Sequence, residues 1–246
     1  MAFKKNTAPV NFLNGDALTP DMIGIGMLFG GSPSANPPIE RTLVAASIEG
    51  IMKHDGRVIA LLTDWLTVHY ERVYVDRLFQ LLDQLDPIEF KPILVYWTAN
   101  AQRLKKDPRF AKIAKLYQGP RINYEQIGKT KDNVSYDATE FLIQRNGEDE
   151  RFIGTCLRVA KKTIRHRLDD ILPPEKLGLQ HLTYWYRALL GSNVRADLWT
   201  SLKQRPDLSP AELARHCDSS YTAAYLAKKD FEFMKRLRSA KRRKAA

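Results

Sequence analysis

The fold is decided by one stretch near the C-terminus, Leu208-Ser209-Pro210-Ala211-Glu212-Leu213-Ala214-Arg215-His216-Cys217-Asp218-Ser219-Ser220-Tyr221. Its beginning predicts the start of a helix, because Ser209 suits the cap position and Pro210 the first helical position. Glu212 stands three residues after Ser209, which is the spacing of a reciprocal capping box. The buried side of this helix is expected to consist of Leu213, Ala214 and Cys217.

A second helix is predicted directly after the first. Asp218-Ser219 forms a short turn, and Ser220 is placed to cap a helix that runs from Tyr221 to about Arg238. Its inner face is expected to consist of Ala224, Ala227 and Phe231. Another helix, Arg195 to Gln204, precedes the pair and ends at Arg205-Pro206-Asp207.

This pattern resembles the helix-turn-helix superfamily, in its three-helix or winged form. The resemblance lies in Ser209-x-x-Glu212-Leu213-Ala214, then Ser220 after five residues, with Ala224 and Phe231 following. Ala214 is the small residue that lets the two helices approach closely. Two positions depart from the usual pattern: Asp218 stands in the turn where Gly is common, and Lys228 where an apolar residue is common. The resemblance spans residues 195–238.

The resemblance implies a DNA-binding surface on the second helix, whose first exposed side chains would enter the major groove. The residues assigned to this surface are Ser219, Ser220, Tyr221, Thr222 and Tyr225, with Lys228 and Lys229 reaching phosphates. The following segment adds seven cations and no acid: Lys235, Arg236, Arg238, Lys241, Arg242, Arg243 and Lys244. Such cations give affinity that is independent of sequence and sensitive to salt. A solvated terminus is the alternative.

Charge along the chain favours the same interpretation. The protein has 246 residues, 39 Lys and Arg, 28 Asp and Glu, and a net charge of +11. Residues 1–38 are neutral and residues 39–100 carry −3, whereas residues 101–190 and residues 191–246 carry +7 each. A basic excess on one part of a chain is typical of proteins that bind polyanions.

The region before the C-terminal stretch is predicted to be mixed. Ala138 to Gln144 and Arg151 to Val159 resemble strands of a hairpin around Asn146-Gly147. The basic stretch from Lys161 to Leu168 is expected to be helical, with Arg158, Lys161, Lys162, Arg165 and Arg167 forming a solvated face or an extension of the DNA-binding surface. Leu182 to Leu190 predicts a helix whose three aromatic residues pack in the core rather than stack on bases.

The first half of the chain is predicted to be an α-helical unit. Apolar spacing predicts helices over 39–52, 58–73, 75–85 and 93–104, with a fifth from Pro108 to Tyr117. The expected division is therefore an irregular segment 1–38, an α-helical unit 39–118, a mixed segment 119–190, a helix-turn-helix domain 191–238 and a basic tail 239–246. The fold class is mainly α with a small β-hairpin.

Signals of an enzyme are weak. Gly128-Lys129-Thr130 lacks the preceding Gly of a phosphate-binding loop, because Asn123 stands there. Phe29-Gly30-Gly31-Ser32 has no carboxylate pair on a neighbouring strand, and the Asp86, Glu89 and Lys91 set lies in one predicted turn. The five histidines and two cysteines have no metal-ligand spacing, so no metal, cofactor or catalytic residue is assigned. His69 is expected to be a core histidine.

The sequence therefore predicts a non-enzymatic protein that binds duplex DNA, either a transcriptional regulator or a DNA-associated component of a larger system. The N-terminal helical unit is expected to serve self-association or binding of a protein partner. No membrane segment or disulfide framework is expected, and a cytoplasmic location follows from this. Two alternatives stay open: a nucleic-acid-processing enzyme whose site assembles in space, and an adaptor that binds RNA or an acidic protein.

Overall fold

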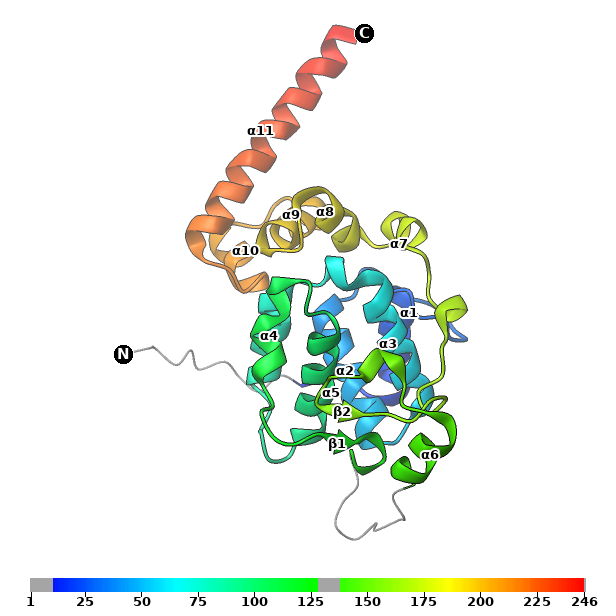
Figure 1. Ribbon diagram of the computed structural model, residues 1–246. Helices are drawn as coiled ribbons and strands as arrows, with labels where there is room; N and C mark the ends of the chain where they lie inside the picture. Colours follow the sequence, from blue (N-terminus) through cyan, green and yellow to red (C-terminus); the bar gives the residue numbers. More distant parts are fainter. Residues whose placement is uncertain (1–10, 128–137, 246) are drawn as a thin grey trace, which may run out of the picture. The chain divides into compact units, whose positions relative to one another are not determined.

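The computed structural model describes residues 11–127 and 138–245, with side chains up to Leu237 in the last helix. The protein is mainly helical and has one small β element, as the sequence predicts (Figure 1). It divides into two compact units, Met1–Leu177 and Gly178–Ala246. We call them unit 1 and unit 2 and describe each by itself.

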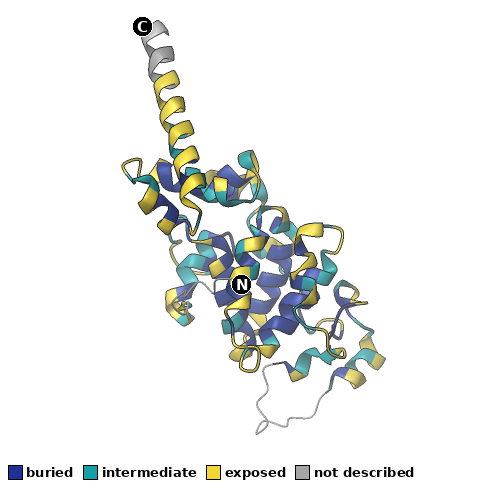
Figure 2. Ribbon diagram, turned by 90° about the vertical axis from the view of Figure 1, so that its left-hand side faces the viewer, coloured by how far each residue is buried: buried dark blue, intermediate teal, exposed yellow. Residues whose placement is uncertain are grey.

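Five helices form the core of unit 1. They are α1 (Gly15–Gly24), α2 (Ile39–Met52), α3 (Gly56–His69), α4 (Val75–Asp83) and α5 (Lys91–Arg103). Helix α3 begins where the Asp55 carboxylate accepts the backbone N–H groups of Arg57 and Val58. The apolar faces of α2, α3 and α5 meet in the interior of the unit. Figure 2 shows in dark blue which parts of the chain are buried.

Buried polar groups in this core are paired across helices. The Trp65 indole donates to the carbonyl of Ile25 at 2.7 Å, and the Trp97 indole to the Ser47 hydroxyl at 3.0 Å. The Tyr96 hydroxyl lies 3.0 Å from the Thr63 hydroxyl, and burial raises the pKa of Tyr96 to about 12. Because buried polar groups cost free energy unless they are hydrogen-bonded, these pairs fix which helix faces meet.

The predicted helices over 39–52, 58–73, 75–85 and 93–104 are confirmed as α2 to α5, and the short helix η1 (Tyr70–Arg72) continues α3. Two expectations for the first 118 residues are wrong. The segment 1–38 is not irregular throughout, because α1 lies within it. Residues 108–117 form two short 3₁₀ helices, η2 (Pro108–Ala111) and η3 (Ile113–Lys115), in place of one α-helix.

The rest of unit 1 has little regular structure. Strand β1 (Ile122–Asn123) pairs in parallel with β2 (Leu157–Arg158). The remaining elements are η4 (Tyr124–Gln126), α6 (Thr139–Asn146), η5 (Glu150–Phe152) and η6 (Leu168–Asp170), followed by α7 (Pro174–Gln180) at the junction of the two units.

The predicted β-hairpin is wrong. Residues 139–146 form helix α6, and Gly147, at φ 84°, ends that helix instead of forming a hairpin turn. A short apolar run fits a strand or a helix equally well, so its pattern alone does not separate the two. The predicted helix from Lys161 to Leu168 is also wrong: it is an irregular loop in which Lys162 has a left-handed backbone with φ 72°.

A buried ionic network holds this irregular segment to the helical core. The Asp64 carboxylate on α3 is 1% exposed and accepts from Arg151 Nη1 at 3.1 Å and from the backbone N–H of Arg167. Arg151 also donates to Asp149 at 2.7 Å and to the carbonyl of Ile164. Burial alone would raise the pKa of Asp149, but hydrogen bonds from Arg151 hold that pKa below its usual value. One carboxylate and one guanidinium therefore tie three segments together.

His69 makes the stability of unit 1 depend on pH. The ring is buried and its Nε2 lies 3.0 Å from the carbonyl of Leu172. Burial lowers the pKa of His69 from 6.5 to about 4. Between these values the unfolded chain binds the proton more readily, so stability should fall as the pH drops, by about 3 kcal/mol in all. Urea denaturation at several pH values measures this loss.

The variant His69→Gln should remove this part of the pH dependence. Equal slopes for His69→Gln and the unchanged chain would contradict the assignment of the effect to His69.

Candidate nucleic-acid interface

Unit 2 is built from four helices after the junction. They are α8 (Leu182–Leu190), α9 (Val194–Gln204), α10 (Pro210–His216) and α11 (Tyr221–Ala245). The first two begin at side-chain caps: His181 Nδ1 accepts the N–H of Tyr184, and Asn193 accepts two N–H groups of α9. An ion pair at 3.0 Å between buried Arg187 and partly exposed Asp197 joins α8 to α9.

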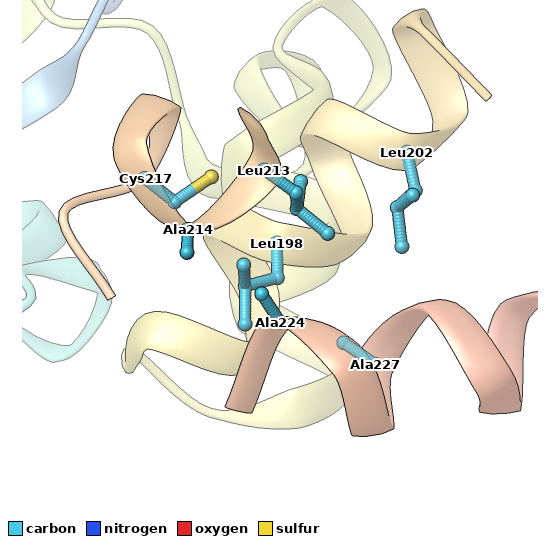
Figure 3. Close-up of a cluster of buried hydrophobic side chains, with 7 residues drawn as sticks. All are labelled: Leu198, Leu202, Leu213, Ala214, Cys217, Ala224 and Ala227. Carbon is cyan, nitrogen blue, oxygen red and sulfur yellow. The ribbon is translucent and has the colours of Figure 1, made fainter. Parts of the chain in front are cut away.

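Three of these helices share one small apolar cluster. Residues from α9, α10 and α11 converge on it (Figure 3): Leu198, Leu202, Leu213, Ala214, Cys217, Ala224 and Ala227. Trp199 and Phe231 pack at its edge, with ring centroids 5.6 Å apart. The predicted inner faces of both helices are confirmed. Alanines at three of the seven positions let the helix backbones approach closely.

The connection between α10 and α11 has the local structure that its residues predict. Ser209 and Glu212 form the capping box, and hydrogen bonds from the Ser209 side chain and N–H lower the pKa of Glu212. Asp218 takes a left-handed backbone with φ 54°, and the N–H of Ser219 returns to the carbonyl of Ala214 at 2.9 Å. The Ser220 hydroxyl accepts from the N–H of Ala223 at 3.1 Å, so the predicted cap is formed.

The face of α11 opposite this cluster is exposed over its first turns. Tyr221 is 59% exposed and Tyr225 is 49% exposed, and their rings stack with centroids 6.4 Å apart. Thr222 and Lys229 are exposed on the same part of the helix. Ser220 is exposed and Ser219 half-buried in the preceding turn. The structure thus brings the side chains assigned to base contact onto one short surface.

Lys228 is engaged within unit 2. Its Nζ donates to the carbonyl of Leu208 and lies 4.0 Å from the Glu232 carboxylate. Its side chain is 18% exposed, whereas its neighbour Lys229 is exposed. Lys228, which stands where an apolar residue is usual, therefore binds the loop before α10. Lys229 is the lysine of this pair that is exposed to solvent.

Helix α11 continues beyond the expected end at Arg238, to Ala245 (Figure 1). Lys235 and Arg236 are exposed. Figure 2 shows the part of this helix that is coloured by burial as mostly exposed. The side chains of the other predicted cations, Arg238, Lys241, Arg242, Arg243 and Lys244, lie outside the described residues. Counted from the sequence, α11 carries nine Lys and Arg against two acids.

Sequence reasoning missed one property of α11. Leu226, Phe233 and Leu237 are each about half exposed, and their spacing places them along one stripe. The stripe was readable from the intervals of seven and four residues, but the prediction weighed only the inner face and the cations. In α8, Tyr184 and Tyr186 are buried as predicted, whereas Trp185 is 47% exposed.

The motifs that suggested enzymes gain no support. Gly128-Lys129-Thr130 lies outside the described residues. Phe29 lies in a loop with the Arg57 guanidinium 4.9 Å from its ring centre, and Asp86 accepts the N–H groups of Ile88 and Glu89. Within residues 11–127 and 138–245, no three His, Cys, Asp or Glu side chains lie close enough to hold a metal.

Comparisons with protein families, curated proteins and solved structures found no match for this chain. In the described part of the chain, no helix combines the length and apolar character needed to cross a membrane. Over the described residues of unit 2 after Gly178 there is no strand, so these residues form no wing. The geometry of α9, α10 and α11 is therefore the feature of unit 2 that bears on function.

The capping box should support α10 measurably. Ser209→Ala removes a cap hydrogen bond and should lower the stability of α10 by about 1 kcal/mol. Ser219→Ala is a matched control, because the Ser219 hydroxyl makes only a 3.4 Å contact with the carbonyl of Ser220. Hydrogen exchange of the Leu213 and Ala214 amides measures the stability of α10 in each of the two variants. Equal protection in the two variants would show that the box adds nothing.

Proposed function

We propose that this protein binds duplex DNA through the first turns of α11. The observation that carries the proposal is the exposed face of Tyr221, Thr222, Tyr225 and Lys229, held by a three-helix cluster on the opposite side. A helix presented in this way has the size to enter the major groove. Phenol, hydroxyl and ammonium groups supply both base-edge and phosphate contacts.

The cations of α11 have different roles in the proposed binding of DNA. Lys229 and Arg236 are exposed and suited to phosphate contact, and the later cations extend the positive charge along the same helix. Burial and the nearby Arg205 lower the pKa of His216, so this ring adds little charge at neutral pH. Lys228 is left out of the proposed contacts because Leu208 and Glu232 engage it.

This activity suits a cytoplasmic transcriptional regulator or a DNA-associated component of a larger system. In either case unit 1 is free to bind a protein partner or a second copy, and its predicted helical part carries net negative charge. The two alternative functions make different predictions. An adaptor for RNA should bind RNA more tightly than duplex DNA, and a nucleic-acid-processing enzyme should cleave DNA when a divalent metal is added.

Base contacts should be separable from phosphate contacts. Tyr221→Ala or Thr222→Ala should reduce the preference for a selected site over random duplex by about 1–3 kcal/mol, because the variant cannot make the base contact. Lys229→Ala should weaken both duplexes equally. Fluorescence anisotropy titrations measure the affinity of each variant for the selected site and for random duplex. The selected site comes from selection in a random-sequence library.

Lys228→Ala is the matched control for Lys229→Ala, because it removes the same charge from the neighbouring position. It should lower the stability of unit 2 and change DNA affinity less than Lys229→Ala does. A library that yields no preferred sequence would contradict base recognition by α11. Equal effects of the two lysine variants on DNA would contradict the assignment of Lys229 to phosphate contact.

The end of α11 should set the salt dependence of binding. Replacing Lys241, Arg242, Arg243 and Lys244 by Gln keeps the length of the helix and removes four charges. The slope of log affinity against log salt should become shallower by about 0.9 for each phosphate that the variant no longer neutralises. An unchanged slope in anisotropy titrations at several salt concentrations would show that this end does not touch DNA.

A further inference from the structure

Unit 1 contains a cavity that the DNA-binding proposal does not use. Its volume is about 820 Å³, within the range of small-molecule sites. Part of its lining comes from Asn146, Asp149, Glu150 and Arg151. The rest comes from the loop of residues 160–167, which we call the basic loop. The basic loop contributes four polar side chains to the lining: Lys161, Lys162, Arg165 and His166.

The acids at this cavity are already neutralised by partners. Both oxygens of Asp149 accept hydrogen bonds from Arg151, and Glu150 pairs with Lys161 at 2.9 Å. Lys162 and Arg165 are exposed and have no carboxylate within ion-pair distance among the described residues. The cavity therefore keeps an excess of positive charge in a concave surface, which attracts anions.

The basic loop is held in place before any ligand arrives. The N–H of Lys161 donates to the carbonyl of Gly147 at 2.9 Å. Ile164 is buried, and its carbonyl accepts a hydrogen bond from Arg151. The N–H of Arg167 is bonded to buried Asp64. Lys162 keeps a left-handed backbone between these anchors, which costs free energy that the surrounding contacts offset. Cations on an anchored loop lose little conformational entropy on binding a ligand.

His166 adds a fourth group with a fixed orientation. Its Nδ1 lies 3.5 Å from the Asp64 carboxylate, and the side chain is 66% exposed. A guanidinium and an ammonium that line one cavity, with an imidazole beside them, suit the several acceptor oxygens of a phosphate group.

We propose that the cavity beside the basic loop binds a small ligand that carries phosphate groups. Its concave shape favours a small ligand over the convex backbone of a duplex. The proposal does not rest on the DNA-binding function, because the cavity is formed entirely by unit 1.

Isothermal titration calorimetry of the full chain with pyrophosphate, at ionic strength held constant with sodium chloride, tests this proposal. The unchanged protein should bind at one saturable site. Lys162→Ala/Arg165→Ala should weaken binding about tenfold or more, because it removes two charge-assisted hydrogen-bond donors. Lys105→Ala/Lys106→Ala is the matched control: it removes two exposed charges after α5, away from the lining residues, and should change affinity less than about twofold.

Three results would overturn the proposal. The first is no binding up to about 10 mM pyrophosphate. The second is an equal loss of affinity in both double variants, which would mean diffuse electrostatic attraction. The third is a Lys162→Ala/Arg165→Ala variant that keeps its pyrophosphate affinity and loses duplex affinity, which would make the basic loop a DNA contact. Thermal melting of each variant checks that it is folded.

Discussion

The ion pair between the buried Asp64 carboxylate and the partly buried Arg151 guanidinium is the interaction on which unit 1 depends. The carboxylate belongs to a helix of the core, and the guanidinium belongs to a segment with almost no regular structure. Removing one partner from a buried pair leaves an uncompensated charge and commonly costs about 3–5 kcal/mol. Here the loss of Arg151 would also release the carbonyl of Ile164, and the loss of Asp64 would release the N–H of Arg167, in a segment with few ladder hydrogen bonds of its own. An ionic contact thus holds this irregular segment in place, as hydrogen bonds between strands do in a β-sheet.

Unit 2 is organised by a different kind of force. Its centre is a cluster of seven buried residues, three of them alanines, closed at its turns by hydroxyl and carboxylate caps. Because so little side-chain volume separates the helices, only one face of α11 is used for packing. The outward faces are left to other roles: stacked tyrosines, a row of cations and a stripe of half-exposed apolar residues. The small side chains of the cluster therefore explain both the small core of unit 2 and the large exposed surface of α11.

The sequence predicts best what is decided locally. The capping box at Ser209, the turn at Asp218 and the inner face of α11 depend on residues within a few positions of one another, and all three are present. Expectations fail where a distant partner decides. Asn146-Gly147 fits a hairpin turn and a helix end equally well. The predicted helix after Lys161 does not form, and the N–H of Arg167 is instead bonded to the Asp64 carboxylate, 103 residues earlier in the chain. The engagement of Lys228 by Leu208 was equally invisible, because spacing does not reveal which carbonyl needs a donor.

Each unit contains one buried cysteine, Cys156 in unit 1 and Cys217 in unit 2, and neither forms a disulfide. Burial raises the pKa of Cys156 to about 11, so its reactive thiolate is scarce at neutral pH. A thiol reagent therefore modifies either residue only when the surrounding structure opens. The rate at which a thiol reagent labels each cysteine therefore reports the opening of the structure around that cysteine.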